Sequence, residues 1–300
     1  MKPNLTVIIP TRGEEERKLL RAVRSVVGPE AVVIVVFDGR EPSPTTESEL
    51  HELGVVVLKS ASAGASAARN LGARHASTDW LAFIDDDDET NPGWLSFHGT
   101  DEPAEVAIRC SGAVRVSEEG AEIGRMVPTP LGPLYGEATG LFLAGAFSVR
   151  RELFEQVGGF DSAYEFGENN DLGMRLCRHV NSRMLRVETT SDPLVRIEVR
   201  PATQRRHTPE ALLRSAELTL HSNSEVFNVH PSQGVGLHRI AAMNALKLGR
   251  RRIALEHMRK AVRHSSRPLP DALRLLLCVI PGAPLLARRS VDRRAKHLAL

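Results

Sequence analysis

The sequence predicts an α/β protein with a mostly parallel central sheet, helices on both faces of that sheet, and a further α-helical region at the C-terminus. In residues 5–84, short and almost wholly apolar runs alternate with segments of helical periodicity. This pattern is typical of parallel strands that are buried on both faces. From residue 208 onward, the apolar residues recur at helical spacing only.

Four strands are predicted in the first part of the chain: Leu5 to Ile9, Ala31 to Phe37, Val55 to Leu58 and Leu81 to Ile84. Apolar residues at helical spacing from Leu19 to Val27 predict a helix after the first strand, and a second helix is expected at about Ser66 to His75. In such sheets, ligands bind at the carboxyl ends of the strands. The residues just beyond the four strand ends, which should meet at one crevice, are Thr11-Arg12, Asp38-Gly39, Ser60-Ala61 and Asp85 to Asp88.

Later elements are predicted as strands at Val106 to Val116 and Leu141 to Val149, and as helices at Arg151 to Val157 and Asp171 to Val180. Helical segments follow near 208–222, 234–248, 250–264 and 269–279. We therefore expect a first domain at residues 1–207 and a basic helical region at residues 208–300.

Charge is divided unevenly along the chain. Apolar content of 42%, charged content of 25% and aromatic content of 4% are typical of a globular enzyme and do not favour a base-stacking surface. Residues 1–200 contain 21 Lys and Arg and 31 Asp and Glu, whereas residues 201–300 contain 18 and 6. The basic C-terminal third is compatible with peripheral contact with an anionic membrane face or with a solvated basic surface. No nucleic-acid motif accompanies the charge, so nucleic acid is not an expected partner.

The expected location is cytoplasmic, with peripheral contact at the inner membrane face as an option. Three widely spaced cysteines favour a reducing compartment over a disulfide framework. The N-terminal apolar stretch of five residues is too short for a secretory signal. The apolar stretch from Leu273 is interrupted by Arg274, Pro281 and Pro284 and does not read as a membrane span.

The segment FIDDDDETNPGW places four consecutive carboxylates, Asp85 to Asp88, directly after the fourth strand. Alternate residues of an extended segment point the same way, so Asp85 and Asp87 can both face the crevice. Two such carboxylates suit Mg²⁺ or Mn²⁺, whose other ligands are then water and substrate phosphates. The alternative is a solvated acidic turn.

Upstream, SASAGASAARNLGARHA at residues 60–76 reads as a loop of small residues that passes into a helix. Small residues allow a ligand to approach the backbone, and a helix N-terminus offers free N–H groups to a phosphate. Arg69, one turn into the helix, is expected to pair with a diphosphate or a carboxylate, or else to be a surface cation. Neither the dinucleotide fingerprint nor the P-loop motif is present here, so those two sites are not predicted.

Four segments in this order resemble the family 2 glycosyltransferases with the GT-A fold: VIIPTRGEEERKLLRAVRSV, VVIVVFDG, SAGASAARNLGARHASTDWLAFIDDDD and GAFSVRRELFEQVGGFDSAYEFGENNDLGMRL. The resemblance covers about residues 4–180. It implies metal-dependent transfer of a sugar from a nucleoside-diphosphate sugar to a hydroxyl acceptor, with inversion and with Mn²⁺ or Mg²⁺ as the cofactor. The acceptor is a glycan, a lipid-linked molecule or a small molecule, and the nucleobase, sugar and linkage stay open.

The resemblance also implies a set of site residues. The implied nucleotide-sugar site comprises Pro10, Thr11, Arg12, Asp38, Arg69, Asp85 and Asp86. The DxD motif of the family falls on Asp85 and Asp87, and it implies that Asp87 binds the metal. His207 is a second candidate metal ligand, because some members of the family use a late histidine there; the alternative, which we favour, is a surface histidine beside Arg205 and Arg206. Asp161, in the sequence GGFD, matches the acceptor-side loop.

The catalytic base of inverting members comes from an acidic pair before a helix that begins Asp-Leu. In GENNDL, Glu168 keeps the first position, but Asn169 stands where the second acid is expected. Because Asn cannot accept a proton at neutral pH, Glu168 is the base, or Asp171 is, or the chain is catalytically impaired. We favour Glu168 and expect Asp171 to cap the helix that it precedes.

Two other functions stay open at this point. A sugar nucleotidyltransferase would share the fold, but it normally has a Gly-rich loop with a basic residue after the first strand, whereas PTRGEEE offers one Gly and three acids. A non-catalytic sugar-nucleotide-binding or assembly protein is suggested by Asn169.

Overall fold

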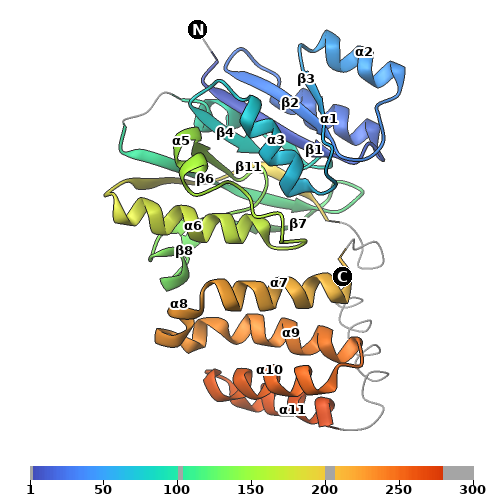
Figure 1. The fold of residues 1–300 in the computed structure, drawn as a ribbon. Helices are drawn as coiled ribbons and strands as arrows, with labels where there is room; N and C mark the ends of the chain where they lie inside the picture. Colours follow the sequence, from blue (N-terminus) through green and yellow to red (C-terminus); the bar gives the residue numbers. More distant parts are fainter. Residues whose placement is uncertain (1–2, 101–103, 200–206, 280–300) are drawn as a thin grey trace. The chain divides into compact units, whose positions relative to one another are not determined.

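The computed structural model describes residues 3–100, 104–199 and 207–279 (Figure 1). The chain forms two compact units. Unit 1 comprises Met1–Ser162 and Glu168–Arg200, and unit 2 comprises Ala163–Gly167 and Pro201–Leu300. Each unit is described by itself.

Unit 1 is built on a mixed sheet with the strand order β3-β2-β1-β4-β10-β6-β11-β5. A further strand, β7, lies outside this order and pairs with β6. Four parallel strands form one half: β1 (Leu5–Thr11), β2 (Ala31–Phe37), β3 (Val56–Lys59) and β4 (Trp80–Phe83). The other half contains β5 (Glu89–Thr90), β6 (Val106–Val116), β7 (Glu122–Met126), β10 (Phe147–Arg150) and β11 (Arg186–Glu198). Here β6 and β11 run parallel, and β10 is antiparallel to both β4 and β6. A small separate sheet pairs β8 (Thr129–Pro130) with β9 (Thr139–Gly140).

Helices cover both faces of the sheet (Figure 1). One face packs against α1 (Glu16–Val26) and α4 (Trp94–His98), and the other packs against α3 (Ala65–His75), α5 (Arg151–Gln156) and α6 (Glu168–Ser182). The remaining helices of unit 1 are α2 (Pro44–Glu52) and the short 3₁₀ helix η1 (Pro133–Tyr135).

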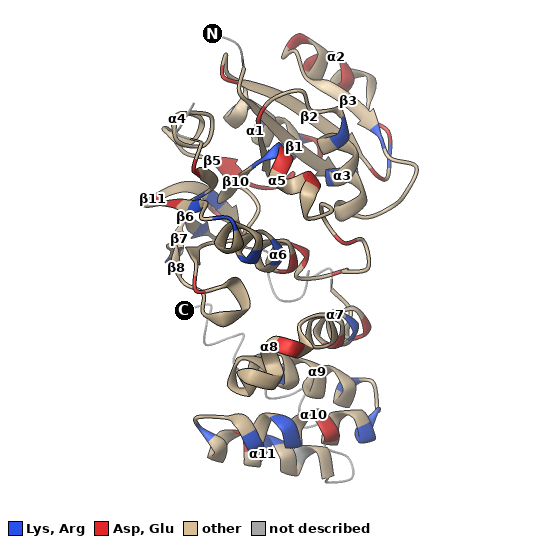
Figure 2. Ribbon diagram, turned by 60° about the vertical axis from the view of Figure 1, so that its left-hand side comes forward, with Lys and Arg blue, Asp and Glu red and all other residues tan. Residues whose placement is uncertain are grey.

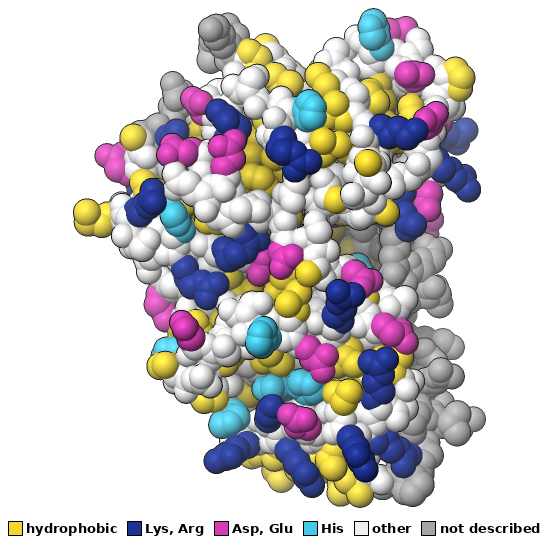
Figure 3. Space-filling model, viewed as in Figure 1, with side chains coloured by type: hydrophobic (Ala, Val, Ile, Leu, Met, Phe, Trp, Pro, Cys, Tyr) yellow, Lys and Arg dark blue, Asp and Glu magenta, His cyan; other side chains and the backbone are white. Residues whose placement is uncertain are grey.

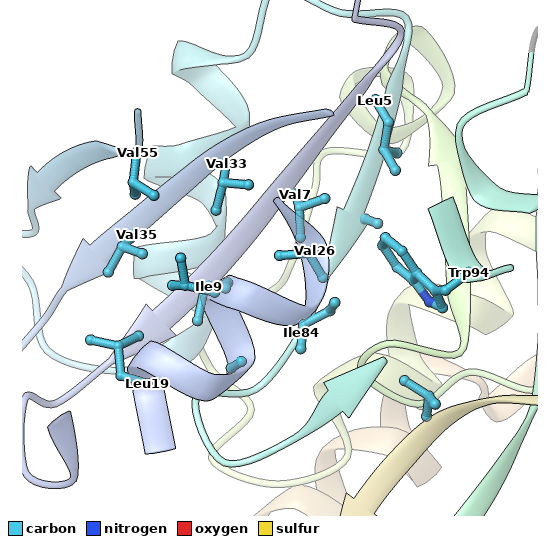
Figure 4. Packing of buried hydrophobic residues seen from close by; sticks show 14 of the residues in the cluster. Leu5, Val7, Ile9, Leu19, Val26, Val33, Val35, Val55, Ile84 and Trp94 are labelled. Atoms are coloured by element: carbon cyan, nitrogen blue, oxygen red, sulfur yellow. The ribbon is translucent and has the colours of Figure 1, made fainter. Parts of the chain in front are cut away.

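The two-residue period of β1 divides its side chains between two cores. Leu5, Val7 and Ile9 are buried with α1 (Figure 4). Ile8 is buried with α3 on the other face. Burying one such aliphatic side chain contributes about 1.5–3 kcal/mol. The predicted class, an α/β protein with a mostly parallel sheet between helices, is confirmed.

Gly72 lets α3 approach β1 closely. A Cβ atom at this position would lie 2.5 Å from Cγ2 of Ile8, which is far too short for two carbon atoms. The helix that carries Arg69 is thereby held against the central strands.

Two predicted elements were wrong in their bounds. The strand expected from Leu141 begins only at Phe147, because Gly145 takes a positive φ of 77° and donates its N–H to the Phe83 carbonyl at 2.5 Å. The helix expected from Asp171 begins at Glu168.

Unit 2 consists mainly of helices: α7 (Pro209–Ser222), α8 (Ser224–Val229), η3 (Pro231–Gly234), α9 (Val235–Lys247), α10 (Arg251–His264) and α11 (Pro268–Val279). Its core is rich in alanine, which allows close helix packing, and includes Ala241, Ala245 and Met258. In the order of packing, α9 lies against α7 and α10, and α10 lies against α11. Within the described ranges, no helix combines the length and the apolar character that crossing a membrane requires.

His98 is a fully buried titratable group in the core of unit 1. Its Nδ1 lies 3.0 Å from Ser148 Oγ, and its Nε2 lies 3.1 Å from Ser111 Oγ. Burial, together with the charge of Arg109, lowers the pKa of His98 to about 3.

We predict that His98 makes unit 1 less stable in acid. The unfolded chain binds a proton on this residue below a pKa of about 6.5, whereas the folded chain does not do so until about pH 3, so stability is lost as pH falls between those values. Between about pH 7 and pH 5, the loss from this group is about 2 kcal/mol.

The measurement is urea unfolding followed by the fluorescence of Trp80 and Trp94, both in unit 1, for the wild type and His98→Gln. Glutamine can still bond the two serines but does not titrate. The stability gap between the two proteins should narrow by about 2 kcal/mol from pH 7 to pH 5. An unchanged gap would contradict the assignment.

Candidate active site

A hydrogen bond between two buried side chains ties together the ends of β1 and β4. Thr11 Oγ1 donates to Asp86 Oδ2 at 2.6 Å, and the Gly13 N–H donates to Thr11 Oγ1 at 3.1 Å. Thr11 is 2% exposed and Asp86 is 8% exposed. This bond fixes the spacing of the two strand ends from which the candidate site is built.

The acidic segment turns back on itself after Asp85. The Asp88 N–H donates to the Asp85 carbonyl at 3.2 Å, and Asp88 Oδ1 accepts from the Glu198 N–H of β11 at 3.0 Å. The assumed extended geometry is therefore wrong for this segment. Exposure still alternates along the segment: Asp85 and Asp87 are half-buried, and Asp86 and Asp88 are buried. Burial, together with the charges of Asp85 and Asp87, raises the pKa of Asp88 well above its usual range.

Arg69 joins two carboxylates that are far apart in the sequence. Its Nη2 donates to Asp85 Oδ1 at 2.6 Å, and its Nη1 donates to Glu168 Oε1 at 2.9 Å. The side chain is 2% exposed. Burial alone would lower the pKa of Arg69, but the two carboxylates outweigh burial and raise it. The guanidinium therefore remains charged and holds the first residue of α6 against the end of β4.

Asn70 holds the loop that supports Arg69. Its Nδ2 donates to the Phe160 carbonyl at 2.8 Å, and its Oδ1 accepts from the Phe160 N–H at 2.9 Å. The Phe160 ring then lies under the Arg69 guanidinium, 5.2 Å from its central carbon. A cation over an aromatic face is stabilised by the ring quadrupole, more so when it is removed from water.

Asp38, after β2, contacts the loop that leads into α3. Its Oδ2 accepts from the Gly64 N–H at 2.7 Å, whereas its Oδ1 is buried and has no hydrogen-bond partner among the described residues. A buried acceptor without a partner is costly and is suited to a ligand donor such as a hydroxyl or a ring N–H. Of the neighbouring predicted residues, Pro10 is buried within β1, and Arg12 is exposed with its Nε 3.8 Å from Glu14 Oε1.

Asp87 faces different neighbours from Asp85. It lines a polar cavity of about 60 Å³ together with Arg21 of α1, Glu89 of β5 and Glu198 of β11. Arg21 is 3.5 Å from Glu89 and 3.7 Å from Glu198, so the cavity contains both signs of charge.

A metal ion at Asp87 would take most of its ligands from outside the protein. Across the described residues, no three His, Cys, Asp or Glu side chains group as a ligand set. One or two carboxylates completed by water and phosphate oxygens is the coordination that Mg²⁺ ordinarily accepts. The residues present therefore fit a cation that arrives with a diphosphate.

The first turn of α6 carries two carboxylates with different partners: Glu168 pairs with Arg69, and Asp171 pairs with Arg175 of the same helix. Glu168 is 19% exposed and contacts Arg69. Asp171 is 5% exposed, and its Oδ2 accepts from both Nε and Nη2 of Arg175 at 2.9 and 2.6 Å. The expectation that Asp171 caps the helix was wrong, because the helix begins three residues earlier and Asp171 pairs along it. Asn169 Nδ2 donates to Glu168 Oε1 at 3.4 Å.

Two further predicted residues, Asp161 and His207, have exposed side chains. Asp161 is exposed in the loop after Phe160. His207 is exposed in unit 2, where its ring packs edge-on against Phe166 at 4.7 Å. Their acceptor and metal roles stay predictions.

Sequence reasoning missed three supporting contacts: the Asn70 bonds to Phe160, the Arg175 pair with Asp171, and the backbone of β11 at Asp88. Only the second had a usable signal, since Asp171 and Arg175 are four residues apart on a helix. The other two join segments whose proximity depends on the fold.

Residues 6–98 match the model of Glycosyl transferase family 2. An uncharacterized glycosyltransferase of Haemophilus influenzae is 24% identical over 195 residues, which cover 57% of this chain and 61% of that protein. A pre-mycofactocin glycosyltransferase of Mycobacterium tuberculosis is 31% identical over 187 residues, which cover 58% and 39% of the two chains. The chain thus spans less than two thirds of the length of either relative.

Among solved structures, S. aureus TarS 1-349 superposes with a TM-score of 0.57 at 16% identity, covering 89% of this chain and 81% of that one. The same TarS fragment in complex with UDP-GlcNAc gives a TM-score of 0.59 at 15% identity, covering 88% and 81%. At this identity the likeness concerns the fold, and the predicted GT-A class is confirmed.

We predict that Arg69→Lys destabilises unit 1 by about 1–3 kcal/mol, because an ammonium lacks the planar fork that bonds in two directions, and a partly buried carboxylate then loses its partner. The matched control is Arg74→Lys, an exposed position on the same helix, which should change stability by less than about 0.5 kcal/mol. Urea unfolding followed by tryptophan fluorescence measures both variants. Equal losses in the free energy of unfolding for the two variants would mean that the pairing of Arg69 with Asp85 and Glu168 does not stabilise unit 1.

Proposed function

We propose that this chain, whose residues 6–98 match the model of Glycosyl transferase family 2, transfers a sugar from a nucleoside-diphosphate sugar to a hydroxyl acceptor, with inversion at the anomeric carbon. The observation that carries this proposal is the pairing of Arg69 with both Asp85 and Glu168. It puts a buried cation, a carboxylate at the strand end and a second carboxylate at a helix start within one cluster.

The donor would bind along the ends of β2 and β4. The unpartnered Oδ1 of Asp38 would accept from the base or ribose, and Asp85 would accept from a ribose hydroxyl. Arg69 and the N–H groups at the start of α3 would face the diphosphate, whose charge they complement. Because TarS has been crystallised with UDP-GlcNAc, a UDP-sugar is the first donor to test.

A divalent cation, Mn²⁺ or Mg²⁺, would bind to Asp87 together with the diphosphate oxygens. When bound, it would act as a Lewis acid on the leaving diphosphate. Arg69 would stabilise the same developing charge from within the protein.

Glu168 would act as the base. The acceptor oxygen forms the new bond to the anomeric carbon, its proton passes to the Glu168 carboxylate, and the bond from that carbon to the diphosphate oxygen breaks. Asp171 is a weaker candidate, since Arg175 occupies its Oδ2 with two donors and the side chain is 5% exposed. The contact between Arg69 and Glu168 would keep the base oriented beside the donor site.

A non-catalytic sugar-nucleotide-binding protein is the second candidate. One specific observation favours it. Of the Glu168-Asn169 pair, only Glu168 is a carboxylate, and it already pairs with Arg69. Such a protein would bind the nucleotide and turn nothing over.

We predict that Glu168→Gln separates the two candidates. The amide oxygen can still accept from Arg69, so the affinity for UDP with Mn²⁺ should change by less than about threefold, while the rate of sugar release from a UDP-sugar falls by about 100-fold or more. Binding is measured by calorimetry and turnover by release of UDP. Equal turnover in the wild type and the variant would exclude Glu168 as the base, and absence of turnover in the wild type with retained binding would favour the non-catalytic protein.

Asp87→Asn is expected to remove the part of UDP binding that depends on Mn²⁺. The wild type should be stabilised against heat more by UDP with Mn²⁺ than by UDP alone, because a ligand that binds only the folded state raises its stability. In the variant the two shifts should be equal. Glu118→Gln, on the same polar cavity, is the control and should behave as the wild type. A variant that keeps the Mn²⁺ effect in full would disprove the metal site. The same assay with GDP, TDP and CDP would identify the nucleobase of the donor.

A further inference from the structure

The last described helix, α11, carries an apolar stripe that faces solvent. Leu269, Leu273, Leu276 and Val279 are 79%, 66%, 54% and 60% exposed. They follow one another at intervals of three or four residues, which places them on one side of the helix. A continuous exposed stripe of this kind marks an interaction surface more often than isolated apolar residues do.

Buried residues on the opposite side fix the orientation of the stripe. Asp271, which is fully buried, accepts from Arg239 Nε and Nη2 at 2.8 and 2.6 Å and from Arg274 Nη1 at 2.7 Å. Cys278, on the side of α11 away from the stripe, is 3% exposed and packs in the core of unit 2. Since these contacts pin α11 to α9, the leucines are held outward within this unit.

The stripe is bordered by positive charge. Residues 250–274 contain eight Lys and Arg and two acidic residues. Six of the basic side chains are exposed: Arg250, Arg252, Arg259, Lys260, Arg263 and Arg267. Lys and Arg predominate over Asp and Glu on α10 and α11 in Figure 2, and hydrophobic and basic side chains adjoin along the lower edge of Figure 3.

We propose that α11 docks on an anionic lipid surface, with its leucine stripe among the acyl chains and the basic residues of α10 and the α10–α11 connection at the lipid headgroups. Apolar contact supplies one part of the binding and charge complementarity supplies the other, which is how an amphipathic helix lies in a membrane interface without spanning it. A second copy of the chain fits less well, because two such faces would bring like charges together. A nucleic acid would satisfy the basic residues but not the leucines.

The test is flotation of the full chain with vesicles of phosphatidylcholine alone or with about 30% phosphatidylglycerol, in low and high salt. The wild type should bind the anionic vesicles, and high salt should weaken the binding. Leu269→Gln, Leu273→Gln and Leu276→Gln together should lower the partition coefficient at least tenfold in both salts. Arg263→Gln with Arg267→Gln should lower it about fivefold for each charge removed, in low salt only.

Two matched controls remove exposed residues elsewhere. Val229→Gln, at a position 72% exposed on α8, and Arg74→Gln, on α3 of unit 1, should bind as the wild type does. The proposal is overturned if the wild type ignores anionic vesicles, if the controls lose as much binding as the stripe variant, or if sedimentation shows a dimer that the triple leucine variant abolishes while vesicle binding is absent. UDP binding, measured on the same samples, keeps this outcome separate from the proposed sugar transfer.

Discussion

The double pairing of Arg69 is the interaction on which the candidate site depends. A guanidinium buried to 2% exposure needs compensating charge, and it has two carboxylates, one at the end of β4 and one at the start of α6. The rest of unit 1 supports this arrangement. Gly72 brings α3 close to β1, Asn70 holds Phe160 beneath the guanidinium, and the Thr11 bond to Asp86 fixes the neighbouring strand ends. A planar cation that can bond in two directions joins parts of the chain that are 99 residues apart.

This arrangement also explains how one site could treat two carboxylates differently. Glu168 and Asp171 lie in the same turn of α6, yet Glu168 pairs with Arg69, which Asp85 shares. Asp171 pairs instead with Arg175 on its own helix. Asp88 is buried beside its acidic neighbours, which raises its pKa, whereas Asp87 lines a polar cavity. The environment of each acid, rather than the acidic run as such, determines the chemistry that it can perform.

The sequence predicted the parts of unit 1 that rest on local patterns. The first four strands, α3 and the long helices of unit 2 were found within about two residues, because apolar periodicity and turn residues specify them directly. The strand β11 was missed, since a mixed segment such as VETTSDPLVRIE has no clear alternation and is stabilised by pairing with β6. The strand ends that form the site followed from the rule for parallel sheets. The turn after Asp85 did not, because it includes a tertiary hydrogen bond from the Glu198 N–H of β11 to Asp88. The pair of Asp171 with Arg175 is local to α6 and carried a usable signal.

The most direct test of the central claim is a crystal of the protein grown with UDP and Mn²⁺, with the metal located by its anomalous scattering. The account predicts a single strong peak at the Asp87 carboxylate, with the diphosphate running toward Arg69 and the ribose beside Asp38 and Asp85. A nucleotide bound elsewhere on unit 1, or a metal peak away from the end of β4, would contradict it.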